Sequence, residues 1–251
     1  MRGMTGGLVG ANQSHVTAGQ PVNVAVAAFV RHLHGARFDH ALSTFGTPGA
    51  VGPYDIQVTL ERVARLLAGE AVSWALTGGI ACGLYGFPRT VRDIDLLTAE
   101  SALAPEALAR ELLLGDALPE GRSLLDPHTL VRVDLLKVQA GFSVADLIAR
   151  SRPITLAEGL ALPVLTAEDL LLTRLWQYHA TGEFADDQWN DLMGVVKIQA
   201  PYLDAGYLAT QAHAHDLDAL WCQLCIDTEF GAQSHAADEH SGSAAPGTPG
   251  H

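Results

Sequence analysis

Residues 74–97 read WALTGGIACGLYGFPRTVRDIDLL, and the apolar runs, glycines and acids of this stretch organise the interpretation of the whole chain. The apolar run from Val72 to Leu76 predicts a buried strand. It stops at a Thr-Gly-Gly turn, and the apolar residues that follow at helical spacing predict a short helix. That helix is expected to end at Phe87-Pro88, because the residue before a proline is disfavoured in the helical region. A second strand is predicted over Asp93–Leu97.

Two acids, Asp93 and Asp95, lie two positions apart on this second strand. Side chains alternate between the two faces of a strand, so both carboxylates are expected on one face and Ile94 on the other. Neighbouring acids repel each other, and a fold that places them together usually supplies a cation. The Gly78-Gly79 turn offers backbone N–H groups to a phosphate with no side chain in the way. A phosphate cradle with paired carboxylates indicates metal-assisted phosphoryl or nucleotidyl transfer.

The string Gly-Gly-x-Ala-x-x-x-Tyr-Gly-x-Pro-Arg-x-x-x-Asp-Ile-Asp, which begins at Gly78, resembles the nucleotidyltransferase superfamily, whose members share the fold of polymerase β. Within that superfamily it is similar to a minimal bacterial branch that includes the AbiEii-type toxins. The likeness continues in EDLLLTRLW at 168–176, QWNDLMGVV at 188–196 and LDAGYL at 203–208, and it covers roughly residues 60–220.

The order of predicted elements and the resemblance together give an α+β fold. We expect a small mixed β-sheet with helices on one face at 56–165, the nucleotidyltransferase core, followed by a C-terminal helical bundle at 166–230. The segment 1–55 is expected to be disordered or weakly structured, and 231–251 to be a disordered tail, because both lack periodicity and are rich in small and polar residues.

Further elements follow from caps and periodicity. Ser143 and Thr166, each with an acid three residues later, are expected to open helices. The other predicted elements are a helix at 106–114, a strand at 131–136, a hairpin at 153–164, and helices near 186–199, 203–214 and 217–229. On the strand at 131–136, alternation places Arg132, Asp134 and Leu136 on one face.

The resemblance implies a metal site. In the superfamily two divalent ions bridge the triphosphate and the attacking group, and Mg²⁺ suits this task because it takes carboxylate and phosphate oxygens; Mn²⁺ is a second candidate. By this likeness Asp93 and Asp95 are bridging ligands and catalytic residues. Asp134 is the third carboxylate, which ligates one ion and helps to deprotonate the nucleophile. The alternative is that Asp93 and Asp95 cap a strand or pair with Arg89 and Arg92.

The resemblance also implies a nucleotide-binding set. Gly78 and Gly79 are expected to hold the β- and γ-phosphates through backbone N–H groups. Arg174 stands where relatives carry a Lys that contacts phosphates, and Asp191 is expected to orient Arg174 or to bind substrate. Arg89 is expected either to reach a phosphate or a substrate carboxylate, or to form a salt bridge with a nearby acid.

Two further positions depart from the relatives, which commonly have Ser at Gly79 and Arg at Asp187. The first change removes a hydroxyl donor, and the second replaces a positive charge with a negative one. With the replacement of Lys by Arg174, which is not a neutral exchange, these departures favour weakened turnover or a changed substrate.

Composition limits the partners. Acidic residues outnumber basic ones by 28 to 15, giving a formal charge of −13, which argues against strong non-specific binding to nucleic acid. The longest early apolar run is too short to cross a bilayer and lacks the features of a secretion signal, so a cytoplasmic protein without membrane contact is expected. Cys222-x-x-Cys225 has no second pair to complete a zinc site, and we expect ordinary buried thiols on a helix.

These observations predict a Mg²⁺-dependent nucleotidyltransferase that moves an NMP from an NTP to an acceptor, which could be RNA, a protein or a small molecule. The toxin-like branch favours RNA, and the net negative charge opposes it. The alternative is a non-catalytic nucleotide-binding or toxin–antitoxin module with the same fold and an antitoxin-type protein partner.

Overall fold

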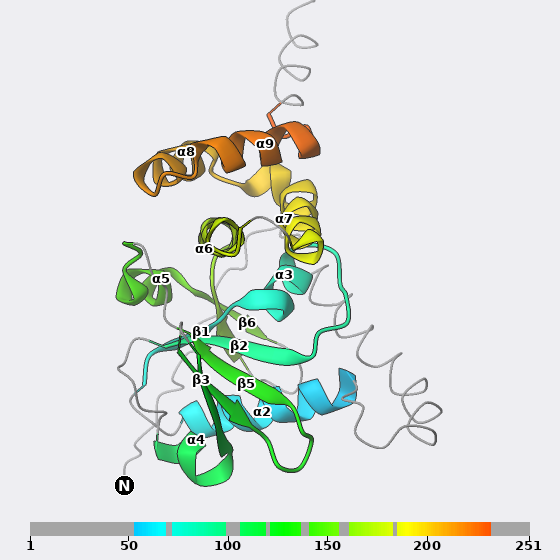
Figure 1. The fold of residues 1–251 in the computed structure, drawn as a ribbon, viewed down its shortest axis with the longest axis vertical. Helices are drawn as coiled ribbons and strands as arrows, with labels where there is room; N and C mark the ends of the chain where they lie inside the picture. The colour runs from blue at the N-terminus through cyan, green and yellow to red at the C-terminus, as the bar shows by residue number, and fades with distance from the viewer. Residues whose placement is uncertain are drawn as a thin grey trace, which may run out of the picture.

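A seven-stranded mixed sheet forms the centre of the protein, and helices lie on both of its faces (Figure 1). The structure is a computed structural model, and it describes residues 53–68, 72–98, 106–118, 121–136, 141–155, 161–182 and 185–231. Most of the predicted segment 1–55 and almost all of 231–251 lie outside the described residues.

The helices are α2 (Pro53–Ala68), α3 (Gly78–Tyr85), α4 (Glu106–Glu111), α5 (Val144–Arg150), α6 (Ala167–Ala180), α7 (Asp186–Gln199), the 3₁₀ turn η1 (Ala200–Tyr202), α8 (Ala205–Ala214) and α9 (Asp218–Thr228). The strands are β1 (Trp74–Leu76), β2 (Asp93–Thr98), β3 (Leu113–Leu118), β4 (Gly121–Leu125), β5 (Arg132–Leu136), β6 (Arg152–Thr155) and β7 (Ala161–Val164).

The sheet has the strand order β3-β4-β5-β2-β1-β7-β6. Its central pair, β2 and β5, is parallel, as is β1 with β7, and the other neighbours are antiparallel. This arrangement confirms the predicted α+β class with a mixed sheet. The parallel pairing of β2 with β5 matters most for function, because it brings together two strands that both carry acids.

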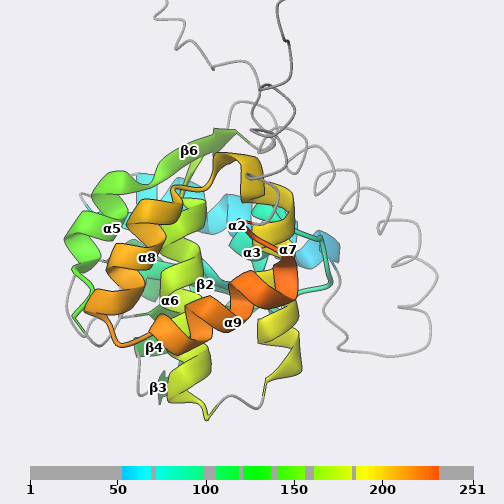
Figure 2. The same cartoon turned by 90° about the horizontal axis from the view of Figure 1, so that it is seen from above.

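Helices cover both faces of the sheet, whereas the sequence predicts them on one face. Figure 1 places α2 and α4 on one side, and α3, α5 and the C-terminal helices on the other. Ile94 and Leu96 of β2 are completely buried on the side of α2, and the acids of β2 point to the side of α3. Seen from above in Figure 2, α8 and α9 lie over α6 and form the outermost layer.

The helix predicted at 106–114 is wrong over its last three residues. α4 ends at Glu111, and Leu113 begins β3, which pairs antiparallel with β4. Leu108 and Leu112 have helical spacing and are both buried, so the periodicity is real as far as Leu112. Pairing with β4 then prevails over local preference, as tertiary contacts commonly do.

Two smaller expectations also need correction. α2 begins at Pro53, inside the segment that was expected to be weakly structured, with proline at the first helical position, where its missing N–H costs little. α9 forms as predicted, but Cys222 is exposed and Cys225 is only half-buried, so this pair does not consist of buried thiols.

The predicted helix starts are confirmed by their caps. Ser143 accepts a hydrogen bond from the backbone N–H of Asp146, and Thr166 accepts one from the N–H of Asp169. Asp204 caps α8 in the same way, by accepting from the N–H of Tyr207 at 2.8 Å. Each cap satisfies a backbone donor that the helix itself leaves unpaired.

The hydrophobic core is continuous from the sheet into the helices α6–α9. At its centre α3 and α7 approach closely, because a Cβ on Gly86 would lie 2.7 Å from the backbone nitrogen of Val195. Gln199 of α7 also donates a 2.7 Å hydrogen bond to the carbonyl of Tyr85. Thr166, where the sequence predicts a domain boundary, is the N-cap of α6, and the division into two domains stays a prediction. No helix among the described residues is both long and apolar enough to cross a bilayer.

Candidate active site

Three carboxylates lie on one face of the central strand pair. In the parallel register of β2 and β5, Asp95 is the partner of Asp134, and Asp93 is the partner of Arg132. Partners on neighbouring strands point to the same face, and so do residues two apart on one strand. The predicted acids Asp93, Asp95 and Asp134 are therefore immediate neighbours, on strands that lie about 4.8 Å apart.

Arg132 lies among these acids. Its Nη2 is 2.5 Å from Oδ2 of Asp93, and its Nε is 3.2 Å from Oδ2 of Asp134. The alternative pairing of Asp93 and Asp95 with Arg89 and Arg92 is therefore not the one observed for Asp93. Arg132 is not among the predicted site residues, although alternation along its strand places it on the face of Asp134.

The surroundings of Asp134 and Asp95 stabilise the charged forms of these two carboxylates only in part. Oδ1 of Asp134 is buried and has no hydrogen-bond partner in the described structure. Burial raises the pKa of the Asp134 carboxyl, while its cross-strand neighbour Ser123 and Arg132 oppose the rise. Burial, followed by the nearby charge of Asp93, raises the pKa of Asp95 to about 6, although Arg174 and the backbone N–H of Gly79 stabilise its charged form.

The Gly78-Gly79 turn lies directly against Asp95. Gly78 has a φ of +65°, a conformation that side chains other than that of glycine disfavour. A Cβ at this position would lie 1.8 Å from Oδ2 of Asp95. The backbone N–H of Gly79 donates a hydrogen bond to the Asp95 carboxylate. In this structure the N–H that was expected to hold a phosphate is therefore engaged by Asp95.

We expect Gly78→Ala to destabilise the protein by about 1–3 kcal/mol, because it combines backbone strain with a direct clash against Asp95. Thermal unfolding of the purified variant measures the change. Gly182→Ala is the control, because Gly182 also has a positive φ, of 84°, but lies in the exposed turn after α6. Equal losses in the two variants would mean that strain alone acts and that the contact with Asp95 adds nothing.

The predicted basic residues form a second group, centred on Asp191 of α7. Arg89 donates to both of its oxygens, from Nε at 2.6 Å and from Nη2 at 2.7 Å. Arg174 approaches the same carboxylate at 3.4 Å and donates to Gln177 at 3.2 Å. Of the two options for Arg89, the salt bridge is the one observed. Asp191 lies beside Arg174, and its predicted role, to orient Arg174 or to bind substrate, stays a prediction.

Arg174 links the two groups. Its side chain is only 11% exposed, and its charge lowers the pKa of Asp95. Its Nε is buried without a hydrogen-bond partner among the described residues.

Cys82 of α3 is buried beside the same charges, and burial raises the pKa of its thiol to about 12, so it stays a neutral thiol at ordinary pH.

The eight predicted site residues therefore form one connected neighbourhood. Asp93 and Asp134 meet through Arg132, and Asp95 contacts the glycine turn. The glycine turn lies beside Arg89, whose Nη2 is 3.2 Å from the position of a Cβ on Gly79. Asp187, which replaces the Arg of relatives, lies near enough to raise the pKa of Arg89, although the bidentate contact with Asp191 is the main cause of that rise.

The acids suit a hard divalent cation, although the described side chains do not already form a ligand set. As placed, no group of three or more His, Cys, Asp or Glu side chains in the described ranges is arranged to hold a metal ion. Arg132 holds one oxygen each of Asp93 and Asp134 instead. The shared face, the unpaired Oδ1 of Asp134 and the raised pKa of Asp95 nevertheless fit a cation that takes oxygen ligands.

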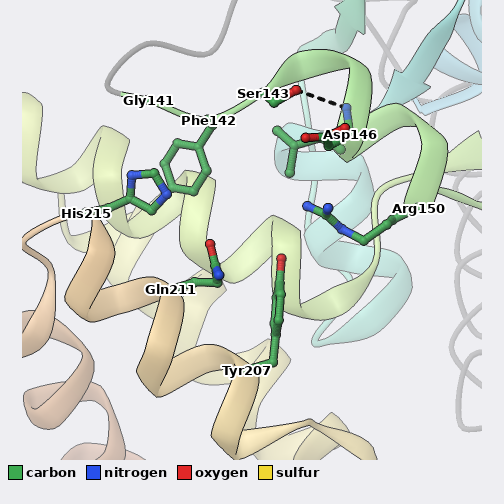
Figure 3. Close-up of a pocket in the computed structure, with 9 residues that line it drawn as sticks. Gly141, Phe142, Ser143, Asp146, Arg150, Tyr207, Gln211 and His215 are labelled. Carbon is green, nitrogen blue, oxygen red and sulfur yellow. Dashed lines mark hydrogen bonds between the residues drawn. The ribbon is translucent and has the colours of Figure 1, made fainter.

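A separate hollow of about 270 Å³ lies between α5 and α8, away from the acids (Figure 3). Phe142 and His215 stack at one end of it, with ring centroids 3.8 Å apart. Arg150 and Tyr207 line the other end. None of the eight predicted site residues lines this hollow.

Comparisons with known proteins give structural similarity only. No protein-family model and no curated protein sequence matches the chain. A crystal structure of ANT(2″)-Ia in complex with adenylyl-2″-tobramycin is similar with 14% identity and a TM-score of 0.47, over 64% of this chain and 97% of that one. An antigenic nucleotidyltransferase-like protein from Paracoccidioides brasiliensis is similar with 14% identity and a TM-score of 0.43, over 70% of this chain and 93% of that one.

Proposed function

We propose that the protein is a Mg²⁺-dependent nucleotidyltransferase, which moves an NMP from an NTP to an acceptor. The observation that carries this proposal is the convergence of three acids from two adjacent parallel strands on one face, directly beside a glycine turn. This convergence occurs in the stretch whose sequence resembles the superfamily. Carboxylates this close together repel one another, and only Asp134 among them is fully buried; a group of this kind costs stability, which suggests that it is kept for function.

Each acid has a distinct part in this proposal. Asp93 and Asp95 of β2 are the bridging ligands, and Asp134 of β5 is the third ligand, placed next to Asp95 by the register. When bound there, Mg²⁺ would neutralise charge on the phosphates and favour attack by the acceptor oxygen. Asp134 is also the proposed base for the acceptor hydroxyl; its Oδ2 contacts Arg132, and its Oδ1 is buried without a partner in the described structure.

The basic group beside the acids is the proposed phosphate site. Asp191 holds Arg89 by two short hydrogen bonds but contacts Arg174 only at 3.4 Å. Arg174 is therefore the less tightly held of the two guanidinium groups, and it is the residue we assign to the triphosphate. Arg89 is assigned the positioning of Asp191, because its guanidinium is already engaged on two sides.

The experiment that tests the proposal uses purified full-length protein with each of the four α-³²P-labelled NTPs, with Mg²⁺ or with EDTA. The proposal expects Mg²⁺-dependent release of pyrophosphate and transfer of label to the protein itself, to added tRNA or to a small-molecule extract. The distribution of label also identifies the acceptor class, including the RNA acceptor that a toxin of the AbiEii type would use. NTP binding without transfer to any of these would favour the second candidate.

That second candidate is a nucleotide-binding or toxin–antitoxin module without turnover. The observations that favour it are Gly79 in place of a hydroxyl donor, and Asp187, whose negative charge lies near Arg89. Both weaken the electrostatic grip on a triphosphate.

We expect Arg174→Ala to raise the KM or Kd for NTP about tenfold, which is the usual scale for losing one charge-assisted contact. Arg174→Lys should recover most of this loss, because relatives carry Lys and because the positive charge is retained. Steady-state kinetics or NTP titration measures both variants. If Ala and Lys weaken binding equally, Arg174 supports the fold and does not contact phosphate.

A further inference from the structure

Arg132 contacts two of the three proposed metal ligands at once. It begins β5 directly across from Asp93 and two residues before Asp134, so all three side chains lie on the same face. Its guanidinium reaches one oxygen of each acid, at 2.5 Å and 3.2 Å. A cation that used both carboxylates would have to share these oxygens with Arg132 or displace it.

The charges around the site make such competition effective. Three carboxylates gather on this face, Arg132 pairs with two of them, and the charge of Arg174 acts on the third, Asp95. Three negative charges against two positive ones leave the group negative, and it attracts a divalent cation. A guanidinium cannot lose its proton in a protein, so Arg132 repels any cation that enters while it stays in place. Each of its contacts therefore opposes metal binding directly.

The surroundings of Arg132 allow it to move away. Its side chain is 52% exposed, whereas the side chain of Arg174 is only 11% exposed. Rotation of the Arg132 side chain towards solvent therefore leaves its guanidinium hydrated and costs little. The ion pairs that it would break are half-exposed, and such pairs are weak. Arg174 lacks this freedom, and for that reason the two arginines beside the acids are suited to different tasks.

We propose that Arg132 is an internal counter-ion, which neutralises Asp93 and Asp134 in the metal-free protein, competes with the divalent cation for them, and thereby sets the metal affinity of the site. This inference rests on the proposed function, because it assumes that these acids bind metal. Arg132 acts through the ligands and is a positioning residue. Its removal should tighten metal binding, whereas removal of a residue that only supported the site would weaken it.

The test compares Mn²⁺ affinity in the full-length wild-type protein, Arg132→Gln and Arg132→Lys, by isothermal titration calorimetry without nucleotide. We expect Arg132→Gln to bind Mn²⁺ about tenfold more tightly or better, since a positive charge next to the cation is gone. Arg132→Lys should lie between the two, because an ammonium keeps the charge but does not span two carboxylates as the guanidinium fork does. Thermal unfolding should also show a larger stabilisation by Mn²⁺ in Arg132→Gln than in wild type.

Arg122→Gln is the matched control. Arg122 lies on the neighbouring strand β4 but pairs with Leu135, and so points to the opposite face of the sheet. The Arg122→Gln variant therefore removes one positive charge from the protein without removing a contact to the three acids. If Arg122→Gln tightens Mn²⁺ binding as much as Arg132→Gln does, the effect is one of net charge and the inference is overturned.

Asp95→Asn separates this inference from the proposed function. If wild-type binding depends on Asp95 but Arg132→Gln leaves it unchanged or weaker, Arg132 is not a competitor and the proposed function survives. If Asp95→Asn has no effect on Mn²⁺ binding, either in the wild-type protein or in Arg132→Gln, then the acids do not bind the metal. In that case both the metal site and the role of Arg132 are overturned.

Discussion

Asp95→Asn is expected to reduce NMP transfer by at least about a thousandfold while leaving the protein as stable as wild type or more stable. The loss of activity follows from removing a proposed metal ligand, because metal-ion stabilisation supplies several kcal/mol of the barrier reduction, at about 1.4 kcal/mol per factor of ten. The gain in stability follows from the pKa of Asp95, which burial and Asp93 raise to about 6. A carboxylate with a raised pKa is destabilising when ionised.

The pH dependence of the free energy of unfolding provides a second test of the expected gain in stability. The folded protein binds a proton at Asp95 more readily than the unfolded chain does, whose ordinary value is 3.8. The contribution of Asp95 to the free energy of unfolding should therefore rise as the pH falls from about 6 to about 4, and it should be absent above pH 6. In Asp95→Asn this contribution should vanish, and the variant should gain about 1–2 kcal/mol relative to wild type at pH 8.

The measurements are pyrophosphate release for activity, and urea unfolding at pH 5 and pH 8 for stability. Asp146→Asn is the control, because Asp146 lies on the exposed first turn of α5 and does not belong to the acid group. A variant of Asp95 that lost both activity and several kcal/mol of stability would contradict the assignment. In that case Asp95 would be a structural acid.

Asp169→Ala is expected to produce the largest loss of stability, about 2–4 kcal/mol. The Asp169 side chain is 1% exposed, and Arg150 donates to both of its oxygens, at 2.9 Å and 3.0 Å. Tyr207 adds a third hydrogen bond at 2.7 Å. Asp169 of α6 thus joins α5 to α8, whose facing residues Arg150 and Tyr207 are drawn in Figure 3.

The estimate lies below the usual cost of breaking a fully buried ion pair, because Arg150 is 45% exposed and can be hydrated once its partner is lost. For a protein of this size the loss corresponds to a fall in Tm of roughly 5–15 °C, measured by differential scanning calorimetry. Tyr207→Phe is the matched control and should cost about 1 kcal/mol, because it removes one hydrogen bond and little volume. Equal losses in the two variants would show that the ion pair with Arg150 adds nothing.

Much of the fold follows from local sequence. The caps at Ser143 and Thr166 and the helical period after them place α5–α9 within a few residues, since a cap depends only on its own turn. The β3–β4 hairpin was missed for the opposite reason. The run Leu112-Leu113-Leu114 is compatible with helix or strand, and only pairing with β4 decides between them.

The site was predictable in its parts but not in its connections. Alternation placed Asp93 with Asp95 and Arg132 with Asp134, because the side-chain period of a strand is a local property. The register that sets Arg132 across from Asp93 depends on two strands meeting, and nothing in either strand specifies it. The ion pair between Arg89 and Asp191 joins residues 102 positions apart, so only the folded chain reveals which acid Arg89 meets.

The backbone contact between α3 and α7 also bears on how such a protein can diversify. A Cβ on Gly86 would lie 2.8 Å from the carbonyl carbon of Gly194, and one on Gly194 would lie 3.0 Å from the ring of Phe87. A side chain at Gly86 would push against the backbone of α7 and so shift Arg89 relative to Asp191, whereas a side chain at Gly194 would meet mainly the ring of Phe87, which is 58% exposed and can move. Substitutions at this joint are therefore tightly constrained by close packing, whereas α5 and α8, which border the separate hollow, do not meet at it.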